Sequence, residues 1–185
     1  MLSSGEANLL SDDFMMLAEA ATKAKTATTA AAGIKDSDGA RVDIIVDNAG
    51  FELVTDLLLA DFMVTSEIAS KVVFQFKSHP TFVSDARASD LRAHVETLAA
   101  LDPKGPHAGC AALGYRWATH LKSGAWVLEE HAFWVQPSPT WELPSELRES
   151  LATSFLAITK GDANYRRLLG DCQWPLDAPF QDVVR

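Results

Sequence analysis

The sequence predicts an α/β domain built on a mostly parallel sheet, and three consecutive segments carry that prediction. Residues 42–46 form an apolar run broken only by Asp43, which is typical of a buried strand. Apolar residues at helical spacing follow from Phe51, and residues 71–76 are β-branched and aromatic, as in the interior of a sheet. A strand, a helix and a second strand make a βαβ unit, whose strands run parallel through a right-handed crossover.

The first predicted helix is amphipathic and begins directly after the first strand. Asn48 is placed as its N-cap, because an amide oxygen at this position accepts a hydrogen bond from a free N–H of the first turn. The apolar residues at helical spacing are Phe51, Val54, Leu57, Leu58 and Phe62. We therefore expect the strand to pass straight into a helix at one edge of the sheet.

The rest of the chain continues the alternation of helices and strands. Apolar residues at four-residue spacing predict helices, and apolar runs that end at Gly, Pro or charged residues predict strands. Helices are expected over residues 88–100, 109–122 and 145–152, and strands over residues 126–135 and 155–159.

The chain is expected to contain one folded domain preceded by a weakly ordered segment. Its 185 residues suffice for a single hydrophobic core. Residues 1–40 are rich in Ala, Ser and Thr and predict a helical and linker segment without a strong pattern. Ordered structure is expected to begin at Arg41, so that the domain spans residues 41–185.

Several classes of protein are disfavoured by composition. A formal net charge of −9 argues against nucleic acid as a partner, because that binding depends on Lys and Arg neutralising phosphates. No apolar run approaches the roughly 18 residues of a membrane span, so no membrane association is expected. Two cysteines without a CxxC motif, and the lack of a secretory signal, favour a cytoplasmic location. The motifs of P-loop, dinucleotide-binding, serine hydrolase and zincin sites do not occur in the sequence.

Polar side chains follow three of the predicted strands. Asp47 and Asn48 come directly after the first strand, and Asp85 lies between the second strand and the next helix. Because the carboxyl ends of parallel strands meet at the edge where open α/β sheets bind ligands, we expect these side chains to converge. Their hard oxygen atoms suit Mg²⁺ or Mn²⁺. A third polar cluster follows the strand over residues 155–159 and consists of Lys160, Asp162, Asn164 and Arg166.

These clusters predict metal-assisted hydrolysis of a phosphoryl group. A divalent cation held by Asp47, Asn48 and Asp85 would polarise the phosphoryl group and activate water, so these three residues are predicted to be both catalytic and metal ligands. Lys160 and Arg166 would stabilise the charge that develops on the phosphoryl oxygens.

Several alternatives accompany this mechanism. Either Asp162 or Glu52 would orient the attacking water or the substrate hydroxyl groups. In a purely structural interpretation, Asp47 is a solvated aspartate beside a plain N-cap, and the third cluster is a solvated turn. Asp47 could also act as a nucleophile. This role ranks lower, because Ala49 occupies the position where such phosphatases commonly carry a second aspartate.

Three segments of the chain resemble motifs of the damage-control phosphatase family. They are Asp47–Leu53 (DNAGFEL), Phe82–Asp85 (FVSD) and Lys160–Arg166 (KGDANYR). Within this family they are most similar to the sugar-phosphate phosphatase branch, also described as acidic-residue methyltransferase-like. The three motifs occur in the family's order, and the resemblance extends from Val42 to Phe180.

The resemblance implies a three-layer α/β/α Rossmann-like domain and a phosphatase that prefers Mn²⁺, Co²⁺ or Ni²⁺. It implies small phosphorylated metabolites as substrates, such as fructose 1-phosphate or fructose 6-phosphate. The alternative activity is S-adenosylmethionine-dependent methylation of protein carboxyl groups. The motifs assign Asp47, Asn48 and Asp85 to the metal, Glu52 to ligand contact, and residues 162–166 to substrate binding.

Two departures from the family pattern accompany the resemblance. Only residues 1–40 precede the first motif, where this branch has a long helical region. An Arg-Thr-x-Lys motif, whose lysine would help to hold the phosphate, is expected after the third motif, and the sequence stops at Arg185 without it. The chain is therefore expected to be a fragment, incomplete at its C-terminus, or a shortened member with impaired catalysis.

Overall fold

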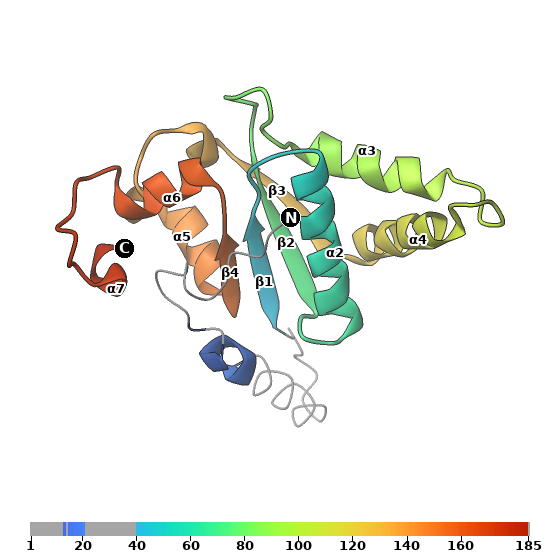
Figure 1. Ribbon diagram of the computed structural model, residues 1–185, viewed down its shortest axis with the longest axis horizontal. Coiled ribbons are helices and arrows are strands. Elements are labelled where there is room, and N and C mark those ends of the chain that lie inside the picture. The colour runs from blue at the N-terminus through green and yellow to red at the C-terminus, as the bar shows by residue number, and fades with distance from the viewer. Residues whose placement is uncertain (1–12, 14, 21–39, 185) are drawn as a thin grey trace.

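The computed structural model describes Asp13, residues 15–20 and residues 40–184, and residues 15–20 are helical. The expectation of a weakly ordered segment over residues 1–40 therefore falls largely outside the described residues. From residue 40 onward the chain forms a four-stranded sheet with helices on both faces (Figure 1).

The sheet confirms the predicted parallel arrangement. Its strands are β1 (Arg41–Ile45), β2 (Lys71–Lys77), β3 (Trp126–His131) and β4 (Leu156–Thr159), in the order β3-β2-β1-β4. Every neighbouring pair runs parallel, and Ile45 lies opposite both Gln75 of β2 and Thr159 of β4. All four strands therefore end at the same edge, and the segments that leave this edge carry the candidate functional residues.

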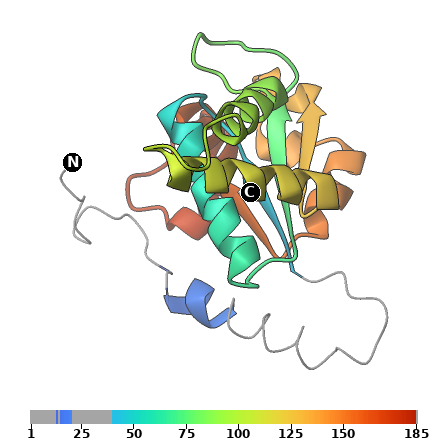
Figure 2. The ribbon, with the colours of Figure 1, turned by 90° about the vertical axis from the view of Figure 1, so that its right-hand side faces the viewer.

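Helices cover both faces of the sheet and make three layers, as the motifs implied. One face is covered by α2 (Phe51–Thr65), α3 (Ala88–Ala99) and α4 (Ala108–Ser123), and the other by α5 (Ser145–Ala152) with the 3₁₀ segment η2 (Ala132–Val135) (Figures 1 and 2). The remaining elements are η3 (Thr140–Glu142), α6 (Asp162–Leu169) and α7 (Phe180–Val183). No helix of the described chain is long and apolar enough to cross a bilayer.

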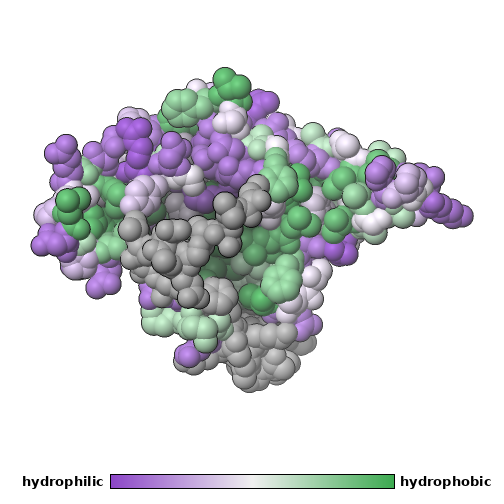
Figure 3. All heavy atoms as spheres, viewed as in Figure 1, coloured by the Kyte–Doolittle hydropathy of each residue, from purple (hydrophilic) through white to green (hydrophobic). Residues whose placement is uncertain are grey.

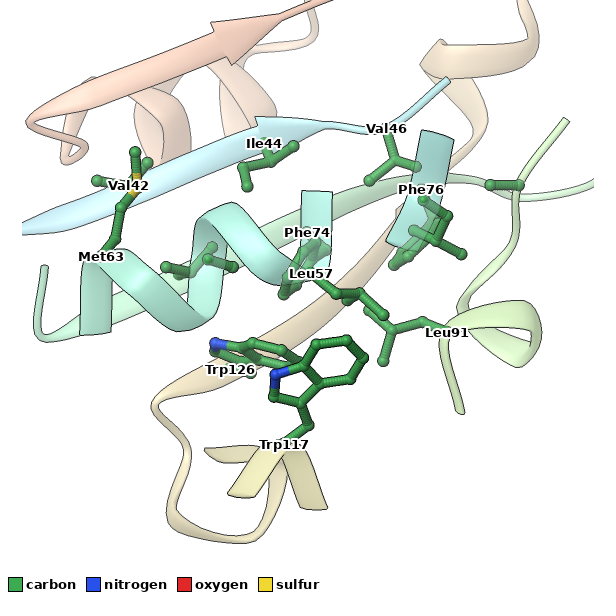
Figure 4. Close-up of a cluster of buried hydrophobic side chains, with 14 of the residues drawn as sticks. Val42, Ile44, Val46, Leu57, Met63, Phe74, Phe76, Leu91, Trp117 and Trp126 are labelled. Carbon is green, nitrogen blue, oxygen red and sulfur yellow. The ribbon is translucent and has the colours of Figure 1, made fainter. Parts of the chain in front are cut away.

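The larger core lies between the sheet and the layer of α2, α3 and α4 (Figure 4). Alternate strand residues, including Ile44, Phe74 and Phe76, are buried there, as expected for the inward face of a pleated sheet. Trp117 of α4 packs against Trp126 of β3 with ring centroids 5.7 Å apart. Large aromatic side chains therefore fill the space between α4 and the sheet.

The opposite face of the sheet carries a smaller core and a buried polar group. The apolar members are Ile45, Phe133, Trp134 and Leu147. Asp43 is fully buried in β1, where it accepts two hydrogen bonds from Arg41, at 2.8 and 2.9 Å, and one from Gln75 at 3.0 Å. A buried carboxylate requires such partners, and they explain how Asp43 interrupts an otherwise apolar strand.

Helix α2 does not bury the face that its apolar spacing predicted. Phe51 and Phe62 are 74% and 59% exposed, and hydrophobic surface gathers over this helix in Figure 3. The buried residues are Leu53, Asp56, Leu57, Ala60, Asp61 and Met63. The buried face of α2 is hard to identify from the sequence because it contains two aspartates, which are usually exposed. Each aspartate has a cationic partner, which makes its burial tolerable.

Two boundaries differ from the sequence prediction. Gly50, with a φ of 70°, is the N-cap of α2, so the placement of Asn48 there is wrong. The Asn48 side chain instead forms hydrogen bonds with Asp47 and Ser84 at the sheet edge. The strand expected over residues 126–135 ends at His131. Its imidazole Nδ1 accepts a hydrogen bond from the Phe133 N–H at 3.0 Å and begins the 3₁₀ segment η2.

Asp61 ties α2 to α4. Its carboxylate accepts hydrogen bonds from Arg116 Nε at 2.7 Å and Nη2 at 2.5 Å, and His120 Nε2 lies 3.1 Å away. Burial opposes ionisation of Asp61, but the hydrogen bonds from Arg116 and His120 outweigh it, so the pKa of this carboxyl lies below its ordinary value. The resulting stability is therefore present above a pH of about 3.9 and is lost as the pH falls through the folded-state pKa.

We expect Asp61→Asn to lower the free energy of unfolding by about 1–3 kcal/mol at pH 7, because charge-assisted hydrogen bonds at a buried group are lost. The difference from wild type should shrink as the pH falls below about 4 and vanish below the folded-state pKa, where Asp61 is protonated in both the folded and the unfolded protein. Urea unfolding over a pH series measures both effects. Asp171→Asn is the matched control, because Asp171 forms a similar pair with Arg166 on the surface. An equal loss of unfolding free energy in both variants would contradict the expectation that the buried pair contributes more than the exposed one.

Candidate functional site

A buried lysine joins two of the predicted site residues at the carboxyl edge of the sheet. Lys77 Nζ donates hydrogen bonds to Asp47 Oδ1 at 2.9 Å and to Asp85 Oδ1 at 2.5 Å, and all three side chains are buried. The register explains part of this meeting. Because Ile45 pairs with Gln75, the residues two positions further along each chain lie side by side on the same face. The structure thus brings Asp47 and Asp85 together around an ammonium group.

The loop after β2 holds Asp85 in place. Asp85 Oδ2 accepts hydrogen bonds from the backbone N–H groups of Thr81 and Phe82, both at 2.8 Å. Burial opposes ionisation of Asp85, but the hydrogen bonds from Lys77 and from these two N–H groups outweigh it, so the pKa of Asp85 lies below its ordinary value. Asp85 is therefore a carboxylate at neutral pH and is available as an anionic ligand.

Asn48 connects the two sides of this edge. Its Nδ2 donates hydrogen bonds to Asp47 Oδ2 and to Glu52 Oε2, both at 2.9 Å, and its Oδ1 accepts one from Ser84 Oγ at 2.7 Å. Its backbone forms an isolated antiparallel bridge with Asp85. The three predicted metal ligands are therefore neighbours, although they come from two separate segments.

A second lysine repeats the arrangement beside the first. Lys160 Nζ contacts the Glu52 carboxylate and lies 3.0 Å from Asp56 Oδ2. Burial raises the pKa of Glu52, but the hydrogen bonds from Lys160 and Asn48 outweigh it and leave this pKa below its ordinary value. For Asp56 burial prevails, and the pKa is raised despite Lys160. The charge of Lys160, which the sequence assigned to substrate, is thus held by two carboxylates of α2.

These contacts form one continuous chain of side chains, named here the edge network. Its members are Asp85, Lys77, Asp47, Asn48, Glu52, Lys160 and Asp56. Four carboxylates against two ammonium groups leave the edge network with a net charge of −2. Unbalanced charge in a partly buried place is unfavourable, and a divalent cation would balance it.

The predicted metal ligands fit a hard divalent cation by their chemistry. Asp47, Asn48 and Asp85 offer the carboxylate and amide oxygens that Mg²⁺ and Mn²⁺ take. The ammonium group of Lys77 between the two carboxylates shows that positive charge is stabilised at this position. Within the described ranges, no three His, Cys, Asp or Glu side chains gather around one metal position, and the candidate ligand set here consists of two carboxylates and one amide. Metal binding itself stays a prediction.

A cleft of 320 Å³ opens beside Lys77 and Asp85. Its other walls are residues 134–137, which follow β3, and α6 with Arg166 and Arg167. A volume of this size suits a small metabolite rather than a polymer.

Two residues of the third motif take part in local structure. Asp162 is exposed at the start of α6, where its Oδ1 accepts a hydrogen bond from the Ala163 N–H at 2.9 Å. Asn164 is buried. It donates a hydrogen bond to the Lys160 carbonyl at 2.9 Å and accepts one from Arg167 Nη1 at 2.7 Å. Asn164 therefore positions Arg167, and direct contact of Asn164 or Asp162 with substrate stays a prediction.

Arg166, the last residue of the third motif, lines the cleft but has a carboxylate partner. Its Nε and Nη2 donate hydrogen bonds to Asp171 at 3.0 and 2.7 Å. The two side chains are 64% and 63% exposed, so water screens this pair. The charge that the sequence assigned to a substrate phosphate is therefore already matched within the protein.

Sequence reasoning missed three residues of this region. Lys77 could have been found from the sequence, because it is a charged residue at the end of an apolar strand. It stands at the position of β2 that corresponds to Asp47 after β1. Asp56 follows Glu52 by one helical turn, so both carboxylates lie on one side of α2. Arg167 lies three residues after Asn164, the spacing at which helical side chains meet.

Gly161 allows the third motif to approach Asp47. Its φ of 88° and ψ of 154° belong to a region that is essentially restricted to glycine. A Cβ atom at this position would lie 2.1 Å from Asp47 Oδ2 and 2.4 Å from Asp47 Cγ. The turn between β4 and α6 therefore packs directly against Asp47, which explains why this motif requires a glycine here.

The family model of the damage-control phosphatase ARMT1-like domain matches residues 2–184 of the chain. The chain belongs to this family. The resemblance that the three motifs indicated is thereby confirmed, and each motif contributes at least one residue to the edge network: Asp47, Asn48 and Glu52 from the first, Asp85 from the second and Lys160 from the third.

Curated relatives agree with this assignment. The damage-control phosphatase ARMT1 of Rattus norvegicus is 40% identical over 148 residues, which cover 78% of this chain and 33% of the relative. The protein of the same name from Danio rerio is 41% identical over 149 residues, covering 79% and 32%, and that from Homo sapiens is 39% identical over 147 residues, covering 78% and 32%. The chain thus spans about a third of the length of the curated relatives it matches.

We expect Gly161→Ala to destabilise the fold by about 1–3 kcal/mol, because the new methyl group meets Asp47 and the backbone conformation is strained. Two alanine variants separate the causes. Gly50→Ala adds strain at a φ of 70° without any neighbour within 4 Å, and Gly109→Ala adds neither strain nor contact within α4. Chemical unfolding should rank the losses as Gly161 above Gly50 above Gly109. An equal loss of unfolding free energy for Gly161→Ala and Gly50→Ala would show that the contact with Asp47 does not contribute.

Proposed function

We propose that this domain is part of a metal-dependent phosphomonoester hydrolase acting on small sugar phosphates such as fructose 1-phosphate or fructose 6-phosphate. The observation that carries the proposal is the meeting of Asp47, Asn48 and Asp85 at the sheet edge, where Asp85 lines a 320 Å³ cleft together with Lys77, Arg166 and Arg167. The name of the relatives, damage-control phosphatase, supports phosphoryl chemistry. Because the chain spans about a third of those proteins, activity and substrate are both part of the proposal.

In this proposal Asp47, Asn48 and Asp85 hold the cation. When bound, it supplies positive charge to the phosphoryl oxygens and activates water. Asp85 acts as a ligand and not as a proton donor, because its pKa lies below the ordinary value. The Asn48 amide is oriented by hydrogen bonds to Asp47 and Glu52, and Lys160 fixes Glu52 in turn. Such outer contacts set the direction of a ligand atom.

Asp47 is assigned to the metal rather than to nucleophilic attack. Its Oδ1 accepts a hydrogen bond from Lys77 at 2.9 Å, and its Oδ2 accepts one from Asn48 at 2.9 Å. The turn at Gly161 also packs against the same carboxyl group. An oxygen that attacks phosphorus needs an open approach, whereas a ligand oxygen can keep these neighbours.

We expect Mn²⁺ to raise the melting temperature of the purified chain, because a ligand that binds only the folded state adds about 2.7 kcal/mol of stability at 100 times its Kd. Asp47→Asn and Asp85→Asn should remove the shift, since each loses a ligand charge. Asp102→Asn is the control, because Asp102 lies in an exposed loop between α3 and α4. Differential scanning fluorimetry measures the shift, and an undiminished shift in both site variants would refute the metal assignment.

Phosphate release from fructose 1-phosphate and fructose 6-phosphate is expected to require the metal and to be at least about 100-fold slower in Asp85→Asn. A colorimetric phosphate assay with and without Mn²⁺, Co²⁺ and Mg²⁺ measures this. The Asp102→Asn variant should keep the rate of the wild type. Metal-dependent stabilisation without any release would contradict the phosphatase proposal while leaving the metal site in place.

A further inference from the structure

Arg167 is a half-buried cation without a carboxylate partner among the residues described. Its guanidinium donates three hydrogen bonds, all to neutral acceptors: Nη2 to the Trp134 carbonyl at 2.8 Å, Nε to the Gln136 carbonyl at 3.2 Å, and Nη1 to Asn164 Oδ1 at 2.7 Å. The ion pairs found in residues 40–184 do not include it. These bonds hold the guanidinium in one orientation, and no carboxylate of the described residues forms a direct ion pair with it.

The surroundings of Arg167 disfavour an unmatched charge. Burial lowers the pKa of its guanidinium, and the negative charges of Asp47 and Asp85 oppose that effect. An arginine nevertheless stays protonated in proteins, so the charge remains. A partly desolvated cation of this kind is stabilised when an anion enters beside it.

The hydrogen-bonding capacity of Arg167 leaves room for such an anion. A guanidinium has five N–H donors, and the three bonds above use one on Nε and one on each Nη nitrogen. One donor therefore remains on each Nη nitrogen. Two such donors in one plane match two oxygens of a phosphate group. Arg167 lines the cleft together with Lys77 and Asp85, so an anion that it binds lies beside the edge network.

The neighbouring arginine lines the same cleft but differs in exposure and in its partner. Arg166 is exposed, and Asp171 occupies its Nε and Nη2 donors. We infer that Arg167, rather than Arg166 of the third motif, binds the phosphoryl group of the substrate in this cleft. The inference rests on the proposed function for the identity of the substrate, whereas the anion site follows from the contacts of Arg167.

Calorimetric titration of the purified chain with inorganic phosphate, with and without Mg²⁺, tests the inference. Arg167→Gln should bind phosphate on the order of tenfold to 100-fold more weakly than the wild type. Arg167→Lys should show an intermediate loss, because it keeps the charge and loses the fork. Arg148→Gln is the matched control. Arg148 also donates hydrogen bonds to main-chain carbonyls, those of Trp141 and Leu143, but it does not line the cleft.

Circular dichroism checks the fold of each variant. If Arg167→Gln does not fold, Arg167→Lys is compared with the wild type instead. Three results would overturn the inference: no phosphate binding by the wild type, wild-type affinity in the Arg167 variants, or an equal loss in Arg166→Gln.

Steady-state kinetics separates this inference from the proposed function. Metal-dependent phosphate release with an unchanged KM in the Arg167 variants would keep the function and remove the role of Arg167. Phosphate binding that depends on Arg167, without release from any sugar phosphate, would leave the anion site standing and contradict the proposed function.

Discussion

The contact of one ammonium group with two carboxylates, Lys77 with Asp47 and Asp85, is the interaction on which the carboxyl edge of the sheet depends. It joins β2, the segment after β1 and the loop that returns to α3. Without the lysine, two buried carboxylates would face each other in a place that water reaches poorly. Asn48 links Asp47 to Glu52 of α2 by hydrogen bonds, and Glu52 is paired with Lys160 after β4. Charged and polar contacts therefore connect the strand ends, the loop and the helix.

The buried polar groups of the opposite sheet face connect the fold to the cleft. Gln75 donates a hydrogen bond to Asp43 at 3.0 Å, and its Oε1 accepts one from the Trp134 indole at 3.4 Å. The Trp134 carbonyl in turn accepts a hydrogen bond from Arg167. One wall of the cleft is therefore anchored in the middle of the sheet, and a buried carboxylate in β1 contributes indirectly to the orientation of the half-buried Arg167.

The sequence was sufficient to predict the parallel sheet and the edge where Asp47, Asn48 and Asp85 meet, because strand runs and βαβ connectivity are local features. It failed where a tertiary contact decides the outcome. Asp56 and Asp61 lie on the buried side of α2 only because Lys160 and Arg116 reach them. Arg166 and Arg167 also differ in ways that depend on tertiary contacts, because Arg166 pairs with Asp171 while Arg167 reaches the main chain after β3. Spacing within a motif does not contain those contacts.

The positions of the tryptophans make separate regions of the molecule optically distinguishable. Trp117 and Trp126 lie in the main core, where the His120 ring is 5.2 Å from that of Trp126. Trp134 lies on the other side of the sheet, bonded to Gln75 beneath the cleft. All three of these tryptophans are buried, so their emission reports loss of the fold, whereas emission from Trp134 also reports events at the cleft that it lines. A single-tryptophan series would separate these two signals within one domain.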